Sequence, residues 1–504
     1  MNRRTFLSAS LSAACLAGRA AAAPAKPNVL ILLADDLGWH DVGFHGSEIR
    51  TPNVDRLASQ GMRFDRAYSF PVCSPTRSGL MTGRSPMRLG VAYTVIRPWS
   101  SYGVPVEERF MPQAFHDAGY QTSITGKWHL GHAYKRFLPR SRGFDHSYGH
   151  VNGAIDYFTH ERDGGLDWSR DGVSVREEGY STFLLGDETI KLIKNRDKSR
   201  PFFHYLPFNA PHAPLEAPPD YIDRYANIRD EKRRRYAAMT EAMDTTVGRV
   251  LKTLDEEGIA DNTLVLFFSD NGGPVQSGAT NTPLRAGKGT AFEGGIRVPA
   301  VMRWPGHLKP GSSTQQVLTM MDYFPTLAGA AGVQPGNTRP LDGKNLWPSI
   351  TSGKVEPRDN IYFAVKRVRR CASAYIIASG SWCGRCREKA ARRRTTCSAS
   401  KRIRRKRTMC RIRILSWWPI SWRAWSTGGS CIRRTACASP TRSRRTITRR
   451  SSGSRRRGTS LQAIEQPRAG GGDFGDGSLE RLLIRLGRLT ESADLAHELE
   501  RGRV

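Results

Sequence analysis

Two apolar runs that each end on a pair of oxygen-bearing side chains constrain the fold most strongly. "NVLILLADD" ends on Asp35 and Asp36, and "TLVLFFSDNGG" places Asp270 and Asn271 at the corresponding point. Continuous apolar runs of this length are typical of strands that are buried on both faces of a mainly parallel sheet. Because the carboxyl ends of such strands meet at one edge, we expect these four polar side chains to lie together.

Other strand-length runs also end on reactive side chains. "YQTSITGKWH" ends on Lys127 and His129, and "PFFHYLPFNAPHAP" leads to His212. Segments with apolar residues at helical spacing lie between the runs, the longest being "RRYAAMTEAMDTTVGRVLKTLDEEG". Strands that alternate with helices predict an α/β fold, a wound sheet flanked by helices. We expect one large domain over residues 26–358 and a separate C-terminal region over residues 359–504.

The polar pairs predict a site for a divalent cation. Asp35, Asp36, Asp270 and Asn271 offer hard oxygen ligands, which suit Ca²⁺ or Mg²⁺ better than a softer metal. One such pair after a strand is more often a turn or a helix cap. Two pairs in one sheet favour the metal interpretation.

Cationic and imidazole side chains surround the expected cation. Lys127 and His129 are separated by one residue. His212 lies in a proline-stiffened loop, and Lys288 lies among glycines in "LRAGKGTAFEGG". Taken singly, each is more often a solvated lysine or a hydrogen-bonded core histidine. Together with a divalent cation they describe a pocket for a tetrahedral oxyanion ester, a phosphate or a sulfate.

The N-terminal residues predict export. "MNRRTFLSASLSAACLAGRAAAAPAKP" combines Arg3 and Arg4 with a short apolar run and alanine-rich cleavage options, so we expect residues 1–25 to be a twin-arginine signal peptide read by export machinery. The destination is the periplasm or the exterior. A lipoprotein attached through Cys15 is the weaker alternative. The run is too short to span a membrane, and no other segment is a candidate, so we expect no stable membrane span.

Cys73 stands alone in the part of the chain that reads as globular. It lies in "FPVCSPTRSGLMTGR", and Cys15, the only other cysteine before residue 366, leaves with the expected signal peptide. A lone thiol in an exported protein is either buried and inert or chemically used.

The C-terminal region differs sharply in composition. The formal net charge of the whole chain is +32, but 29 of its 78 Lys and Arg residues lie between Lys366 and Arg457, with Glu388 as the one acid. Seven of the nine cysteines also follow residue 366, without a clear period of 2 or 3.6. We interpret residues 359–504 as a frameshifted or disordered segment, which leaves an inactive product as one alternative. A basic nucleic-acid-binding tail is the other, but it leaves the ordered polar motifs unexplained, so we expect no nucleic acid partner.

The motifs resemble those of type I, formylglycine-dependent sulfatases. "CSPTRSGLMTGR" resembles their Cys-x-Pro-x-Arg signature and the Thr-Gly-Arg element, and "GKWHLG" resembles their second signature. "DDLGWHDVGFHG", "TPNVDRLASQG", "SDNGG" and "LDGKNLWPSI" keep the family order between about residues 27 and 354. Within the family, "PHAPLEAP" and "TPLRAGKGTAFEGGIRVPAV" most resemble arylsulfatase B, the N-acetylgalactosamine-4-sulfatase group. The resemblance implies an alkaline-phosphatase-like fold with a smaller C-terminal subdomain, which is not recognisable here after about Lys366.

The resemblance also implies residue roles. Cys73 would be oxidised to Cα-formylglycine by a formylglycine-generating enzyme, and the aldehyde hydrate would attack sulfur. Arg77 and Lys127 would hold the hydrate, and His129 would assist its deprotonation. Lys288 and His212 would grip the sulfate, with His212 favoured as the acid for the leaving oxygen. The implied cation ligands, for Ca²⁺ or alternatively Mg²⁺, are Asp35, Asp36, Cys73, Asp270 and Asn271.

The substrate implied is a sulfated carbohydrate or an aryl sulfate. A phosphomonoester or phosphonate hydrolase on the same scaffold stays an alternative, because it can share the formylglycine. Aromatic and imidazole candidates for the substrate rim, each with ordinary packing as the competing interpretation, are His45, Trp99, His116, Tyr157, His160 and Trp168.

Overall fold

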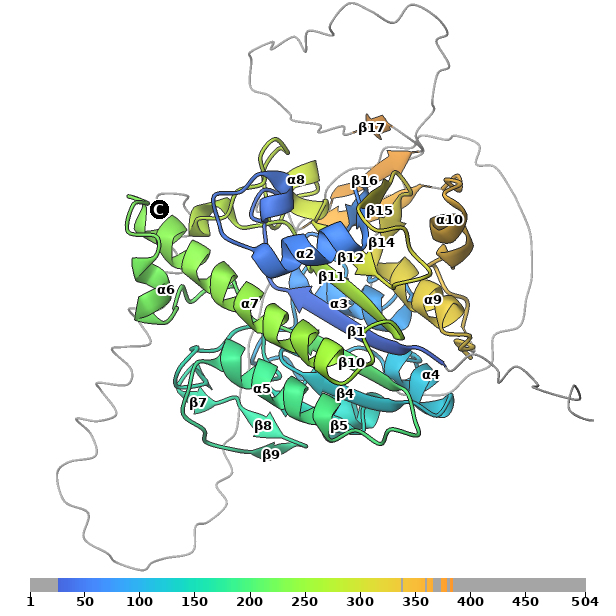
Figure 1. The fold of residues 1–504 in the computed structure, drawn as a ribbon, viewed down its shortest axis with the longest axis horizontal. Helices are drawn as coiled ribbons and strands as arrows, with labels where there is room; N and C mark the ends of the chain where they lie inside the picture. The colour runs from blue at the N-terminus through green and yellow to red at the C-terminus, as the bar shows by residue number, and fades with distance from the viewer. Residues whose placement is uncertain (1–25, 337–338, 359, 366–372, 379–380, 384–504) are drawn as a thin grey trace, which may run out of the picture. The chain divides into compact units, whose positions relative to one another are not determined.

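The computed structural model describes residues 26–336, 339–358, 360–365, 373–378 and 381–383 (Figure 1). The signal peptide expected over residues 1–25 and almost all of the Arg/Cys-rich region lie outside the described residues. Among the described residues, no helix is both long and apolar enough to cross a membrane.

A mixed sheet of ten strands runs through the centre of the described part of the chain, in the order β13-β2-β12-β11-β1-β10-β4-β5-β8-β9. Its middle is parallel, as the buried apolar runs predict, and consists of β11 (Thr263–Ser269), β1 (Asn28–Ala34), β10 (Phe202–Pro207), β4 (Gln121–Thr125) and β5 (His146–Gly149). Antiparallel pairs begin at β12 on one side and at β8 on the other. The flanking strands are β2 (Met62–Phe64), β8 (Ser169–Arg170), β9 (Val173–Ser174), β12 (Ala300–Arg303) and β13 (Ser312–Thr314).

Helices cover both faces of this sheet (Figure 1). On one face the core packs α2 (Pro52–Gln60), α5 (Ser181–Lys194), α6 (Pro219–Asp223) and α7 (Glu231–Glu256) against alternate residues of β1, such as Leu30 and Leu32. On the other face it packs α3 (Cys73–Thr82), α4 (Met111–Asp117), α9 (Met320–Ala330) and α10 (Trp347–Ser352) against Ile31 and Leu33. Successive residues of a strand point to opposite faces, so one apolar run supplies both cores.

Short elements complete the described chain. They are η1 (Gly43–His45), η2 (Lys135–Phe137), η3 (Pro139–Arg142), η4 (Val275–Ser277), α8 (Glu293–Ile296), β3 (Ala67–Tyr68), β14 (Leu318–Thr319), β6 (Glu161–Arg162) and β7 (Gly165–Leu166). β3 and β14 pair in parallel, and β6 and β7 form a small hairpin.

A second, antiparallel sheet follows the main body. β15 (Ile361–Val365) pairs with β16 (Ser373–Ala378), which pairs with β17 (Ser381–Cys383). The fully buried ring of Phe363 lies 5.6 Å from that of Phe70, measured between centroids. The regular pairing therefore extends beyond Lys366, where sequence patterning alone did not reveal a subdomain, because short strands among arginines carry little periodic signal. The domain boundary at residue 358 stays a prediction.

Candidate active site

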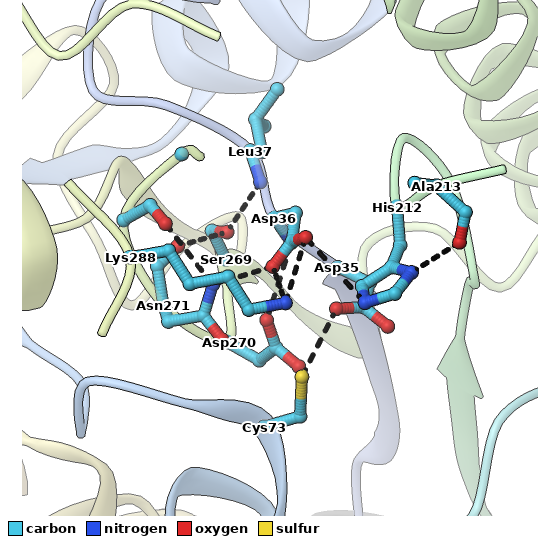
Figure 2. Close-up of polar contacts among 12 residues, drawn as sticks. Asp35, Asp36, Leu37, Cys73, His212, Ala213, Ser269, Asp270, Asn271 and Lys288 are labelled. Atoms are coloured by element: carbon cyan, nitrogen blue, oxygen red, sulfur yellow. Dashed lines mark hydrogen bonds and ion pairs between the residues drawn. The ribbon is translucent and has the colours of Figure 1, made fainter. Parts of the chain in front are cut away.

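The four polar residues that end β1 and β11 lie together at the carboxyl edge of the sheet (Figure 2). The two strands pair in parallel up to Ala34 and Ser269, so the next residues of each leave the sheet side by side. The Asp36 amide donates to Asp270 Oδ1 at 3.3 Å, and Asn271 Nδ2 donates to Asp36 Oδ1 at 2.7 Å. Asp36 has a φ of 71°, a left-handed conformation that a non-glycine residue rarely adopts and that is found most often at functional sites.

Cys73 is the first residue of α3 and is buried against Asp35. Its Sγ lies 3.5 Å from Asp35 Oδ1, to which the thiol donates. Val72 caps the helix without a side-chain hydrogen bond, so the positive end of α3 faces this site. Burial raises the pKa of the Cys73 thiol well above its usual range, and the negative charges of Asp270 and Asp35 raise it further. At neutral pH the thiol therefore stays protonated, which makes it a weak nucleophile.

Arg77 lies one turn after Cys73 and joins both strand ends. Its Nε lies 3.0 Å from Asp270 Oδ2, and its Nη2 lies 3.0 Å from the same oxygen and 3.4 Å from Asp35 Oδ2. Its Nη1 donates to the Lys127 carbonyl at 2.8 Å. The guanidinium therefore fixes α3, β1, β11 and the turn after β4 relative to one another.

Two lysines complete the charge balance. Lys127 Nζ contacts Asp35 Oδ2, and Lys288 Nζ lies 2.6 Å and 2.8 Å from the two carboxylate oxygens of Asp36. Burial alone would raise the pKa of Asp35, but the positive charges, with Lys127 as the largest, hold it well below its usual range. Together with Arg77, the lysines offset the three buried carboxylates, which would otherwise be costly to desolvate.

His129 is a neutral base with a defined tautomer. Its Nε2 lies 3.0 Å from the Ile96 carbonyl oxygen, which can only accept, so Nε2 carries the proton. Its Nδ1 is buried and has no hydrogen-bond partner among the described residues. Burial, then the charges of Lys127 and Arg77, hold the pKa of His129 well below its usual range. The lone pair of this ring that is free to accept a proton is therefore on Nδ1.

His212 faces the same cluster from the loop after β10. Its Nδ1 donates to the Ala213 carbonyl at 2.5 Å, so its Nε2 is the unprotonated atom, 3.6 Å from Asp36 Oδ2. Desolvation by the surrounding protein, followed by the positive charge of Lys288, lowers the pKa of His212 from its ordinary value of 6.5 to about 4. The ring is therefore neutral at pH 7.

The oxygen-rich set fits a hard divalent cation. Ligand atoms of Asp35, Asp36, Cys73 and His212 lie within 4.8 Å of one another. Asn271 Oδ1 is buried and has no hydrogen-bond partner among the described residues, which leaves a carbonyl oxygen free to coordinate. The site brings together the candidate catalytic and metal-binding residues that the sequence singled out, while their individual roles stay predictions.

A close backbone contact positions Lys127. Gly126 has a φ of 140°, and a Cβ on it would lie 1.9 Å from the Pro207 carbonyl oxygen. The Lys127 amide donates to that same oxygen at 2.8 Å. Only glycine therefore lets the turn after β4 approach the end of β10 closely enough to direct Lys127 into the site.

Two buried polar residues near the site were not predicted. Both ring nitrogens of His150, which follows β5, and both amide atoms of Asn209, which follows β10, have no hydrogen-bond partner among the described residues. The signal that identified Asp35, a polar residue directly after a strand, applies to His150, whereas Asn209 is the second residue after its strand. Among the rim candidates, Tyr157, His160 and Trp168 are buried, whereas Trp99 is 78% exposed.

Comparison with known proteins decides the family. The sulfatase family model matches residues 27–333. The chain belongs to the sulfatase family. Members of this family are sulfuric ester hydrolases, and the expected resemblance and alkaline-phosphatase-like fold are confirmed.

This sulfatase has relatives with assigned activities. Arylsulfatase J of Mus musculus is 34% identical over 369 residues, which cover 72% of this chain and 61% of that protein. N-acetylgalactosamine-6-sulfatase of Homo sapiens is 36% identical over 369 residues, which cover 68% of this chain and 69% of that protein. The aligned part is thus under two thirds of the length of arylsulfatase J. The narrower likeness to arylsulfatase B stays a prediction.

Solved sulfatase structures share the fold. The crystal structure of Ps i-CgsB in complex with k-i-k-neocarrahexaose is 36% identical, with a TM-score of 0.67, and covers 70% of this chain and 82% of that chain. The PsFucS1 sulfatase from Pseudoalteromonas sp. is 26% identical, with a TM-score of 0.59, and covers 76% and 87% respectively.

Proposed function

We propose that this protein hydrolyses sulfate esters of a sulfated carbohydrate. The observation that carries the proposal is the buried cluster in which Cys73, at the positive end of α3, contacts a carboxylate and is surrounded by Arg77, Lys127 and Lys288. With all three carboxylates ionised, the three cations leave the site neutral, and a bound divalent cation would make it positive enough to attract a sulfate ester. Relatives named as N-acetylgalactosamine-6-sulfatases, and a structural relative solved with a neocarrahexaose, support a carbohydrate as the substrate.

The proposal also requires a modified side chain at position 73 and a bound metal ion. Cys73, converted to Cα-formylglycine by a formylglycine-generating enzyme, supplies a nucleophilic hydrate in place of the protonated thiol. A calcium ion, with magnesium as the alternative, supplies positive charge against the sulfate oxygens. Residues that would hold the ion are Asp35, Asp36, Cys73, Asp270 and Asn271.

The chain's own residues then divide the work. Arg77 and Lys127 orient the side chain at position 73, and His129 accepts a proton at Nδ1, the atom left free by the bond from Nε2 to Ile96. Lys288 and His212 bind the sulfate. Donation from His212 Nε2 to the leaving oxygen requires the bound anion to raise the pKa of this ring from about 4, which a nearby negative charge does.

The decisive experiment combines mass spectrometry with kinetics. Protein is co-produced with a formylglycine-generating enzyme, and the tryptic peptide that contains Cys73 is weighed. We expect the mass of the aldehyde, turnover of nitrophenyl sulfate, loss of that turnover in Cys73→Ala, and loss in excess chelator that calcium restores. A converted residue 73 without sulfate release, or activity that survives in Cys73→Ala, would contradict the proposal.

The alternative ester is tested in the same assay. Turnover of nitrophenyl phosphate above that of nitrophenyl sulfate would favour the phosphomonoester or phosphonate hydrolase that the sequence left open. A folded, converted protein that turns over neither ester would favour the inactive product.

Export stays part of the proposal. The twin-arginine motif near the N-terminus supports a periplasmic or secreted enzyme, in which the partners are the export machinery, the modifying enzyme and the sulfated substrate.

A further inference from the structure

Two segments beside the catalytic residues carry positive charge without any acidic residue. Residues 84–106 and 126–144 contain no Asp or Glu, and their cations are Arg84, Arg88, Arg97, Lys127, Lys135, Arg136, Arg140 and Arg142. Most of these cations are buried or paired with acidic side chains from other segments. Arg97, Lys135 and Arg136 are exposed and have no ion-pair partner among the described residues, so they carry the local positive charge.

Hydrogen bonds join the two segments to each other and to the active site. The Ile96 amide donates to Ser74 Oγ at 3.0 Å, directly after the signature cysteine, and the Ile96 carbonyl accepts from His129 Nε2. His132 Nε2 donates to the Pro98 carbonyl at 2.8 Å. The solvent-exposed side chains of these two segments are therefore attached to the same loops that contact Ser74 and His129.

What they present is aromatic and cationic. Trp99 is 78% exposed, the highest value among the large hydrophobic side chains of the described residues, and Tyr134 is 48% exposed. The guanidinium carbon of Arg97 lies 5.9 Å from the Trp99 ring, and that of Arg136 lies 4.3 Å from the Tyr134 ring. Neither arginine has an ion-pair partner among the described residues, and both side chains are exposed. We call these four residues the aromatic–arginine surface.

We propose that the aromatic–arginine surface binds the sugar units that flank the reacting sulfate, so that the enzyme acts on sulfated oligosaccharides or polysaccharides rather than on isolated small esters. The inference rests on the proposed sulfatase activity and specifies its substrate class. The apolar C–H face of a pyranose ring packs on an exposed indole or phenol ring. A guanidinium forms paired hydrogen bonds with sulfate oxygens as it does with other oxyanions. The unpaired cations also attract a polyanion, an effect that salt screens.

Competition kinetics test this surface without knowledge of the natural glycan. Short dextran sulfate is titrated into the nitrophenyl sulfate assay, with neutral dextran of equal length and oligothymidylate as competitors. We expect dextran sulfate to inhibit, more weakly at higher salt, and neutral dextran not to. Trp99→Ala and Arg97→Ala should each raise the half-inhibitory concentration about tenfold, with a smaller effect on the KM for nitrophenyl sulfate.

Matched variants make the result specific. Trp99→Phe keeps an aromatic face and should restore most of the dextran sulfate inhibition. Tyr362→Ala removes another exposed aromatic ring, on β15, and should change neither inhibition nor basal activity. Equal inhibition by oligothymidylate and dextran sulfate, with both equally dependent on Trp99, would overturn the assignment to glycans. Inhibition that is unchanged in Trp99→Ala would overturn the surface itself.

Failure of this inference and failure of the proposed function give different results. Fluorescence polarisation of labelled dextran sulfate measures binding even if nitrophenyl sulfate is not hydrolysed. Binding that depends on Trp99 in an inactive protein would leave the surface standing and reject the activity. Sulfate release with no dependence of glycan binding on Trp99 would do the reverse.

Discussion

Ser74 shows how much of this site depends on a single small side chain. Its hydroxyl donates to the His129 carbonyl at 3.0 Å and accepts from the Ile96 amide, while the Ile96 carbonyl holds the His129 ring. One hydroxyl therefore connects α3 to the two loops that determine which nitrogen of His129 is unprotonated. We expect Ser74 to be a positioning residue that acts through His129, the proposed base.

Ser74→Ala should lower kcat about tenfold with little change in KM, since the base loses its orientation while sulfate binding stays. It also leaves two buried backbone groups without their partner, which costs about 1–3 kcal/mol of unfolding free energy. Steady-state kinetics on nitrophenyl sulfate and urea unfolding measure the two effects. Ser78→Ala is the matched control, because Ser78 is equally buried on α3 but its hydroxyl, among the described residues, donates only to the Pro75 carbonyl in the same helix. Equal kinetics in both variants would argue against a positioning role.

The residues that sequence could identify are those that follow long apolar strands. The strands before these residues are continuous apolar runs that end at one edge of a parallel sheet. The sequence therefore predicts that Asp35, Asp36, Asp270 and Asn271 lie together. The contact of Ile96 with His129 was not readable, because it joins loops that are 33 residues apart and is fixed only by tertiary packing. The roles of Arg77, Lys288 and His212 came from the family resemblance rather than from spacing.

At the scale of elements, the turn after β4 depends on a close backbone contact. Gly126 approaches the end of β10 so closely that the Pro207 carbonyl occupies the space of a Cβ. This contact sets the position of Lys127 and the path of the chain toward His129, two residues later. Long helices were predicted from the helical spacing of their apolar residues and central strands from their continuous apolar runs. The two-residue strands β8 and β9 were not predicted, because two residues carry neither signal.

Gly126→Ala should destabilise the fold by at least about 3 kcal/mol and abolish activity, because relief of the clash moves Lys127. Thermal unfolding and nitrophenyl sulfate turnover measure the change. Gly119→Ala is the control: Gly119 also has a positive φ, of 90°, but no atom lies within 4 Å of a Cβ placed there. It should cost about 1 kcal/mol and leave kcat unchanged. A similar loss in both variants would show that backbone strain, not the Pro207 contact, matters at Gly126.

At the scale of the whole molecule, buried imidazoles make the fold sensitive to acid. Burial, followed by the charge of His146, lowers the pKa of His204 from its ordinary value of 6.5 to about 3. Burial also lowers the pKa of His45 to about 4. Below pH 6.5 these histidines are protonated in the unfolded chain but stay neutral in the folded chain. They therefore contribute stability above pH 6.5 that is lost as the pH falls.

The unfolding free energy should therefore decrease as the pH falls from 7 to 5. Replacement of His204 by the non-titrating glutamine should reduce that slope by up to about 1.4 kcal/mol per pH unit. Urea unfolding at several pH values gives the slope for the wild type and for His204→Gln. His45→Gln should change it with the same sign over a narrower range. A slope that is unchanged in His204→Gln, or an unfolding free energy that increases on acidification, would contradict the linkage.

Cys73 is only 1% exposed in the folded protein, which determines when its proposed conversion can take place. An enzyme that must reach this residue and its neighbours Pro75 and Arg77 can do so only before α3 has closed against the sheet. If Cys73 is converted as proposed, conversion and folding would compete for the same nascent polypeptide, and a molecule that folds first would keep a buried, protonated thiol. The yield of active enzyme should depend on how long the segment stays open during synthesis, so slower folding would mean more complete maturation.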